Sequence, residues 1–253
     1  MRALGDAGRR IENLEGNGTM TTIELERTSV AASNDNVTTA AIDFPEAFGD
    51  KQTLKRALFA LQRGPIRFHR DNVIACEGDA ADYLFLVVRG VVRHCKTFEN
   101  GTRNIVAFYL PGDLFGWSDA KHGLSVEAAA DAMVMFIKRA GLLSIASQEG
   151  RVASFLLATT TNDLRRSHEH SLLINKSATC RVATFLADLW TRSGKLKYLD
   201  LPVSHQDIAE YLGVTIETLS RAITGMERSG VLNRVSARRL IIRNEMALEQ
   251  MMR

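Results

Sequence analysis

Two charged residues near the C-terminus, Glu217 and Arg221, are spaced so that they can act together. Residues four apart lie one turn apart on the same face of a helix. There, a carboxylate can accept a hydrogen bond from cytosine N4, and a guanidinium can donate two hydrogen bonds to guanine O6 and N7. Such a pair often forms only a solvated surface ion pair, so the surrounding sequence must decide between the two interpretations.

The residues before this pair have the pattern of a helix-turn-helix. Ser204 followed by Asp207 resembles a capping box, Gly213 permits a tight turn, and Thr215 can cap a second helix. Apolar residues at helical spacing predict that the two helices dock on each other. They are Ile208, Ala209 and Leu212 in the first helix, and Ile216, Leu219, Ile223 and Met226 in the second.

The second helix is therefore expected to present Glu217, Ser220 and Arg221 outward, as a recognition helix presents its base-reading residues. In this context the pattern favours DNA reading over a plain surface pair. Good base contacts of this kind discriminate by about 1–3 kcal/mol each. The hydroxyl residues at the helix starts are predicted to contact the DNA backbone, and they are Ser204, Thr215 and Thr218.

A hairpin wing is predicted after the second helix, because residues 231–235 and 240–242 alternate around Ser236-Ala237-Arg238-Arg239. Arg238 and Arg239 are predicted phosphate contacts. From Ser171 to Arg253 the chain carries 12 Lys and Arg against 8 Asp and Glu, a balance of +4, while the first 170 residues carry 20 against 21. A basic C-terminal part beside a neutral N-terminal part is typical of a DNA-binding module attached to another domain.

Short runs rich in Val, Ile, Phe and Tyr, separated by turn residues, predict a small antiparallel barrel or jelly roll in the first half of the chain. Asn100-Gly101 is a strong hairpin signal. A short helix is expected from Phe44 to about Leu61, and residues 1–42 have the composition of a flexible arm. The predicted strands are Val73-Ile74, Tyr83 to Val88, Val91 to Phe98, Asn104 to Leu110 and Ala132 to Lys138.

One long helix is predicted from Gly141 to about Ser171, and a second amphipathic helix from Ser177 to Trp190. An apolar stripe on the long helix either packs on the chain's own barrel or forms a two-fold seam with a partner, and the pattern alone leaves both open. The stripe consists of Val152, Phe155, Leu156 and Thr159.

The totals fit a two-domain protein of 253 residues, with 45% hydrophobic and 24% charged residues. The sequence contains neither a long apolar run nor a secretory signal, so we expect a cytoplasmic location. Cys76, Cys95 and Cys180 lie far apart and suggest neither disulfides nor a metal site. The G-x-S-x-G, Walker and H-E-x-x-H motifs do not occur, so neither an enzyme nor a cofactor is predicted.

From about Phe44 to its end the chain resembles the Crp/Fnr family of bacterial transcription regulators. The resemblance lies in residues 207–213 (DIAEYLG), 217–221 (ETLSR) and the turn 111–116 (PGDLFG). It implies an α+β protein with an N-terminal jelly-roll domain like those that bind cyclic nucleotides, a dimerisation helix and a C-terminal winged helix-turn-helix. The boundaries expected are 1–42 for the arm, 43–140 for the jelly roll, 141–170 for the dimerisation helix and 171–253 for the DNA-binding domain. The long helix then becomes the expected dimer seam.

Within the family, the arrangement of Glu217, Ser220 and Arg221 is similar to that found in the Fnr and FixK branches. That similarity implies TTGA-type inverted repeats, a homodimer and RNA polymerase as a partner. Trp117 stands where a cyclic-nucleotide site carries Glu, and no cysteine precedes Cys76 to hold an iron–sulfur centre. The FixK subgroup is therefore favoured, and the resemblance implies that this chain controls oxygen-limitation, nitrogen-oxide or respiratory genes. The alternatives are a haem-linked regulator that responds to nitric oxide, with His69, His94 or His122 as axial ligand, and a cyclic-nucleotide-binding module without a DNA role.

Overall fold

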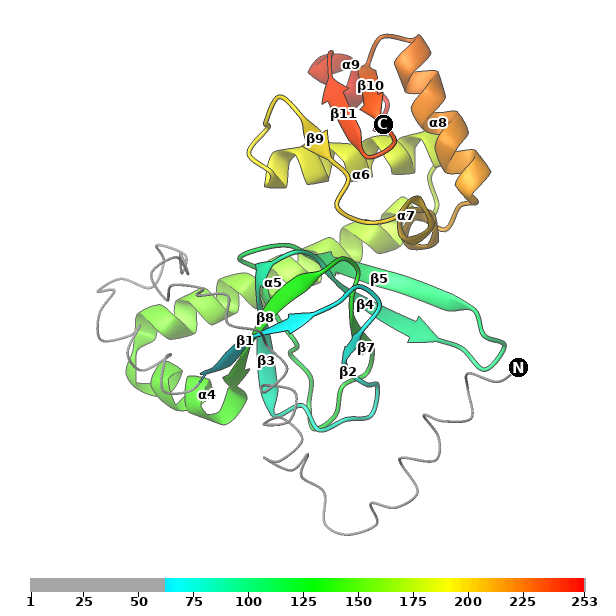
Figure 1. Cartoon of the computed structure of the whole chain (residues 1–253). Helices are drawn as coiled ribbons and strands as arrows, with labels where there is room; N and C mark the ends of the chain where they lie inside the picture. Colours follow the sequence, from blue (N-terminus) through cyan, green and yellow to red (C-terminus); the bar gives the residue numbers. More distant parts are fainter. Residues whose placement is uncertain (1–61, 253) are drawn as a thin grey trace. The chain divides into compact units, whose positions relative to one another are not determined.

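Two four-stranded antiparallel sheets form the first domain (Figure 1). The computed structural model describes residues 62–252, and all of them belong to one compact unit, Ala41–Arg253. The first sheet has the order β1-β8-β3-β6, and the second has the order β2-β7-β4-β5. The strands are β1 (Gln62–Phe68), β2 (Val73–Ala75), β3 (Tyr83–Arg89), β4 (Val92–Thr97), β5 (Arg103–Tyr109), β6 (Leu114–Phe115), β7 (Ser125–Ala128) and β8 (Ala132–Lys138).

Aromatic rings fill the space between the two sheets. Tyr109 stacks on Phe115 with ring centroids 3.9 Å apart, and Phe85 contacts both Phe115, at 5.5 Å, and Phe136, at 5.2 Å. Alternating strand residues point inward, so each strand contributes every second side chain to this core. Gly116 lies against the same rings, since a Cβ atom there would approach Phe85 to 2.8 Å.

The five predicted strands are present within one or two residues of the expected bounds. Three strands of the first domain were not predicted, namely β1, β6 and β7. Gly64 and Pro65 interrupt the apolar pattern of β1, and β6 has only two residues, so neither produces a recognisable run. The helix expected at Phe44 to Leu61 lies outside the described residues.

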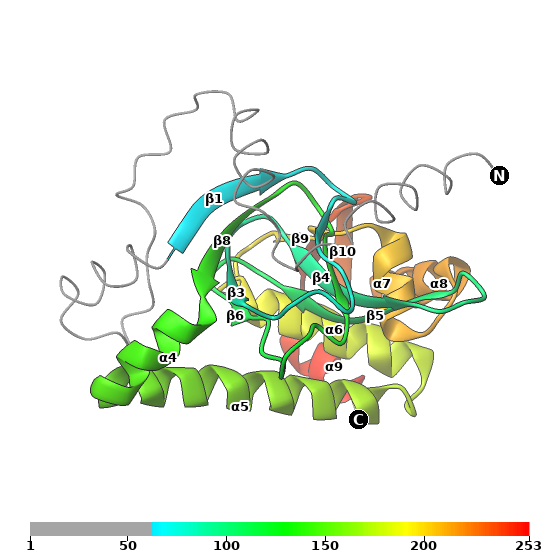
Figure 2. The ribbon, with the colours of Figure 1, turned by 90° about the horizontal axis from the view of Figure 1, so that it is seen from below.

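The single long helix expected from Gly141 to Ser171 is wrong, because the structure has two helices there. They are α4 (Arg139–Gln148) and α5 (Gly150–Leu173), and Glu149 between them is extended, with φ −117° and ψ 96°. Figure 2 shows α5 as a long rod that follows α4 at an angle. No helix among residues 62–252 is long and apolar enough to cross a membrane.

The C-terminal domain consists of small helices around a three-stranded sheet of order β10-β11-β9 (Figure 1). Its largest apolar cluster joins Leu186 of one helix to Ile208, Leu212 and Leu219 of two others. The predicted helix from Ser177 is confirmed, since the Ser177 hydroxyl accepts a hydrogen bond from the Cys180 amide. The elements are α6 (Ala178–Arg192), β9 (Leu199–Asp200), α7 (His205–Leu212), α8 (Ile216–Arg228), β10 (Leu232–Ser236), β11 (Arg239–Ile242) and α9 (Glu245–Gln250).

Candidate nucleic-acid interface

The first helix of the motif, α7, begins and ends where the sequence predicts. The Ser204 hydroxyl accepts a hydrogen bond from the Asp207 amide at 3.0 Å, which satisfies one amide of the first turn. Gly213 ends the helix in the left-handed conformation, with φ 61°, which favours glycine. Ile208 and Leu212 are buried, so α7 is held by apolar packing on one side.

The second helix, α8, is capped by Thr215, whose hydroxyl accepts a hydrogen bond from the Thr218 amide at 3.2 Å. Leu219, Ile223 and Met226 are buried as predicted. Ile216 is not part of this buried stripe, because its side chain is 41% exposed. It is the first residue of the helix, and its exposure shows that the predicted docking role of Ile216 is wrong.

The outward face of α8 carries Glu217, Ser220 and Arg221, all exposed. Hydrogen bonds from its own backbone amide and from the Thr215 hydroxyl hold the pKa of Glu217 below its usual value, and Arg221 lowers it further. The Arg221 guanidinium donates to the Thr218 hydroxyl at 3.3 Å. Thr215 and Thr218 therefore orient the two charged side chains, and these remain open to an incoming ligand.

The predicted hairpin wing is present as β10 and β11, with Leu232 opposite Ile242. Arg238 is exposed at the turn. Arg239 is already engaged: its Nε and Nη2 atoms lie 2.6 and 3.0 Å from the two carboxylate oxygens of Asp200. A phosphate contact by Arg239 would have to compete with this two-point ion pair.

The predicted dimer stripe on α5 faces the chain's own first domain. Val152 and Leu156 are buried against β3 and β8, and Phe155 packs beside them. The Thr159 hydroxyl donates to backbone carbonyls of its own helix. Buried side chains are not accessible to a partner chain, so the prediction that Val152 and Leu156 lie in the dimer seam is wrong. The exposed apolar residues of α5 are Leu157, Leu164 and Leu172, at 69%, 56% and 69% exposure.

A buried ionic network connects α7 to the first domain, and the sequence did not reveal it. The Asp207 carboxylate, 2% exposed, accepts hydrogen bonds from Arg93 at 3.0 Å and Arg103 at 2.8 Å. Arg93 also contacts Glu127 at 2.7 Å, and Arg103 contacts Glu210 at 2.8 Å. The carboxylate of the predicted capping box thus points away from its own helix start.

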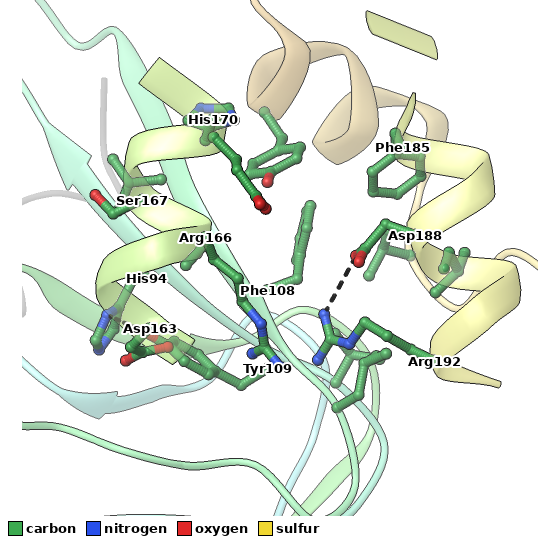
Figure 3. Close-up of a pocket in the computed structure, with 18 of the residues that line it drawn as sticks. His94, Phe108, Tyr109, Asp163, Arg166, Ser167, His170, Phe185, Asp188 and Arg192 are labelled. Carbon is green, nitrogen blue, oxygen red and sulfur yellow. Dashed lines mark hydrogen bonds and ion pairs between the residues drawn. The ribbon is translucent and has the colours of Figure 1, made fainter. Parts of the chain in front are cut away.

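A cavity of about 260 Å³ lies between β5, α5, α6 and α7. Figure 3 shows Arg166 of α5 and Arg192 of α6 reaching into it from different helices. Both guanidinium groups bind one carboxylate, that of Asp113 in the 111–116 turn, and Arg192 also lies 3.7 Å from Asp188. These charges are therefore balanced by partners within the chain.

The three histidines considered as haem ligands lie in different environments. His69 is exposed, and its ring is 3.7 Å from Asp131. His94 lies in the first domain, where burial lowers its pKa to about 4 and its Nδ1 is 3.3 Å from the Tyr109 hydroxyl. Burial also lowers the pKa of His122, whose ring packs on Phe85. Residues 62–252 contain no group of three or more His, Cys, Asp or Glu arranged to hold a metal.

Two family models match the chain. The Crp-like helix-turn-helix domain covers residues 180–251, and the cyclic nucleotide-binding domain covers residues 65–149. The nitrogen fixation regulation protein FixK of Azorhizobium caulinodans is 39% identical over 194 residues, which are 74% of this chain and 78% of that protein. The FixK protein of Rhizobium meliloti is 33% identical over 70% of this chain and 82% of its own length.

Solved structures give the same result. FixK2 from Bradyrhizobium japonicum has a TM-score of 0.70 and 38% identity, covering 74% of this chain and 95% of its own. A CooA mutant from Carboxydothermus hydrogenoformans has a TM-score of 0.64 at 20% identity over 76% of this chain and 87% of its own, which indicates a shared fold. The capped helix pair α7 and α8, the jelly-roll domain and these relatives together lead to one assignment: the chain belongs to the Crp/Fnr family of transcription regulators and is similar to its FixK members.

Proposed function

We propose that the protein binds TTGA-type inverted repeats as a homodimer, with Glu217, Ser220 and Arg221 reading base edges. The observation that carries the proposal is the outward face of α8, where Glu217 and Arg221 are exposed and oriented by Thr215 and Thr218. The carboxylate suits cytosine N4 and the guanidinium suits guanine, as the G·C pair of TTGA requires. The exposed Ile216 beside them offers an apolar contact for a thymine methyl group.

We propose that Ser204, Thr215, Thr218 and Arg238 position the helix on the DNA backbone, and that Arg239 joins them by exchanging Asp200 for phosphate. In the cytoplasm the bound dimer would engage RNA polymerase at genes for oxygen limitation, nitrogen oxides or respiration. The name of a relative from Haemophilus influenzae, an anaerobic regulatory protein that is 27% identical over 65% of this chain, supports targets linked to oxygen limitation. The aromatic packing inside the first domain supports binding without an added nucleotide.

Selection of bound duplexes from a random pool, with purified protein and no added ligand, tests the base-reading assignment. The wild-type chain should enrich TTGA half-sites, and Arg221→Ala should lose discrimination at one guanine by about 1–3 kcal/mol. Lys96→Ala, which removes an exposed cation of the first domain, is the matched control and should retain the preference. An unchanged site preference in Arg221→Ala would rule out the role assigned to Arg221.

We propose that the dimer seam is the exposed side of α5, marked by Leu157, Leu164 and Leu172. These side chains are exposed, and a second copy of α5 would cover them. Half-sites read by such a dimer should be centred one helical turn, roughly 34–36 Å, apart.

Leu164→Glu tests the seam, because a carboxylate buried between two helices is strongly unfavourable. Sedimentation equilibrium should report a dimer of the 28.0 kDa chain for the wild type and a monomer for the variant. Leu196→Glu, at another exposed leucine outside α5, should remain dimeric. Dissociation of Leu196→Glu with retention of the Leu164→Glu dimer would place the seam elsewhere.

A further inference from the structure

One arginine of the wing, Arg234, contacts the outward face of α8 near the C-terminal end of the helix. Glu217, Arg221 and Thr224 follow at i, i+4 and i+7, so they share one face of the helix. The Arg234 guanidinium, from β10, donates a hydrogen bond to the Thr224 hydroxyl at 3.3 Å. A cation from the wing therefore lies beside the same helix face that carries the proposed base readers.

The fold directs Arg234 toward the helix. In β10, Leu232 and Arg234 point to the same side of the strand, and Arg234 pairs with the buried Leu240 of β11. This is the side of the sheet that packs on the C-terminal domain core. The backbone amide of Arg234 also donates to the Glu227 carboxylate at 3.0 Å, which fixes the strand against the last turns of α8.

The guanidinium of Arg234 still has donors to offer. Its side chain is 34% exposed, and its Nε lies 3.9 Å from the Glu227 carboxylate, which is a long contact for an ion pair. One of its five N–H groups is used by Thr224. Arg239 differs, because both oxygens of Asp200 bind it at 2.6 and 3.0 Å.

The position of Arg234 along the helix defines its target. With a rise of 1.5 Å per residue, Thr224 lies about 10 Å beyond Glu217 along the axis. A helix that reads bases with its first turns leaves the major groove, roughly 12 Å wide, near that distance and passes the phosphate backbone. On a duplex bound in this way, an arginine held at this point would face phosphate oxygens, for which a guanidinium is well suited.

We propose that Arg234 is a further DNA-contacting residue, a phosphate ligand that the wing supplies at the end of the recognition helix. This inference rests on the proposed function of α8. Thr224 and Glu227 act as positioning residues, since they hold the arginine side chain and its strand. The contact adds affinity for DNA of every sequence and does not discriminate between sequences, because phosphates carry no base identity.

The salt dependence of DNA binding tests the proposal. Fluorescence anisotropy with the selected duplex measures the slope of log K against log salt. In Arg234→Gln the magnitude of this slope should be smaller than in the wild type by about 0.9 per chain, and by about twice that for a dimer. Between 50 and 200 mM salt, this makes the affinity loss about three- to fourfold smaller per chain. Arg234→Lys keeps the charge and should keep the slope, and Arg239→Gln should change it less than Arg234→Gln does.

A second measurement locates the contact. Methylphosphonate at the phosphate that flanks the half-site should weaken wild-type binding and leave Arg234→Gln unaffected. Arg234→Met retains the aliphatic stem and serves as the neutral variant if Arg234→Gln unfolds. A folded neutral variant, Arg234→Gln or Arg234→Met, whose salt slope equals that of the wild type would overturn the role of Arg234. If the wild-type protein showed no preference for particular DNA sites, the proposed function itself would be overturned.

Discussion

The two helices of the DNA-binding motif use their acidic residues in opposite ways. Asp207 of α7 is buried and accepts hydrogen bonds from Arg93 and Arg103, whereas Glu217 of α8 is exposed and held by an amide and a hydroxyl. A buried carboxylate needs charged partners to compensate for lost hydration, so it becomes part of the scaffold. An exposed carboxylate retains its capacity to accept a new hydrogen bond. Within one motif, burial separates the charge that anchors a helix from the charge that stays available to a ligand.

Removing the buried anchor should have the largest effect on stability. Asp207→Ala leaves Arg93, which is 2% exposed, without one of its carboxylates, and breaking a buried pair costs about 3–5 kcal/mol. Glu127 and Asp71 still contact Arg93, so the lower end of this range is expected. Urea denaturation followed by circular dichroism measures the free energy of unfolding.

The matched control is Glu169→Ala, which breaks the exposed pair with Arg165 on α5. A helical surface pair contributes about 0.2–0.5 kcal/mol, so the control should unfold almost as the wild type does. Equal losses in Asp207→Ala and Glu169→Ala would contradict the distinction between buried and exposed charges.

A smaller effect is expected from pH, because the first domain holds the half-buried imidazole of His94. Burial, together with the nearby His122, lowers its pKa from 6.5 to about 4, so the folded chain keeps His94 neutral where the unfolded chain binds a proton. Stability should therefore fall as the pH is lowered from about 6.5 to about 4, by up to about 3 kcal/mol.

Unfolding of His94→Gln over the same pH range isolates this contribution. The variant should show a shallower decline, and part of the decline should persist because burial also lowers the pKa of His122 and His170. Glu217→Gln, at the exposed acid, should leave the pH profile close to that of the wild type. A profile in His94→Gln as steep as that of the wild type would show that His94 is accessible to protons in the folded chain.

Five strands of the first domain were predictable from their apolar runs and turn residues, and the ends of α7 and α8 were predictable because local hydrogen bonds fix them. Ser204, Gly213 and Thr215 act within three or four residues of chain, so their roles follow from neighbouring letters. The face of α5 was not predictable in this way, because Val152 and Leu156 meet strands far away in sequence. Asp207 was assigned to its own helix start for the same reason, since Arg93 lies 114 positions earlier.

The turn at residues 111–116 has a consequence for how this sequence can diverge. Asp113 is the shared counterion of Arg166 and Arg192, which come from two different helices. Replacing that aspartate alone would take the shared counterion from two cations beside a cavity and leave Arg192 only its longer contact with Asp188. In descendants of this chain, the three positions should therefore change in concert, and substitutions should be tolerated only in combinations that keep the local charges balanced.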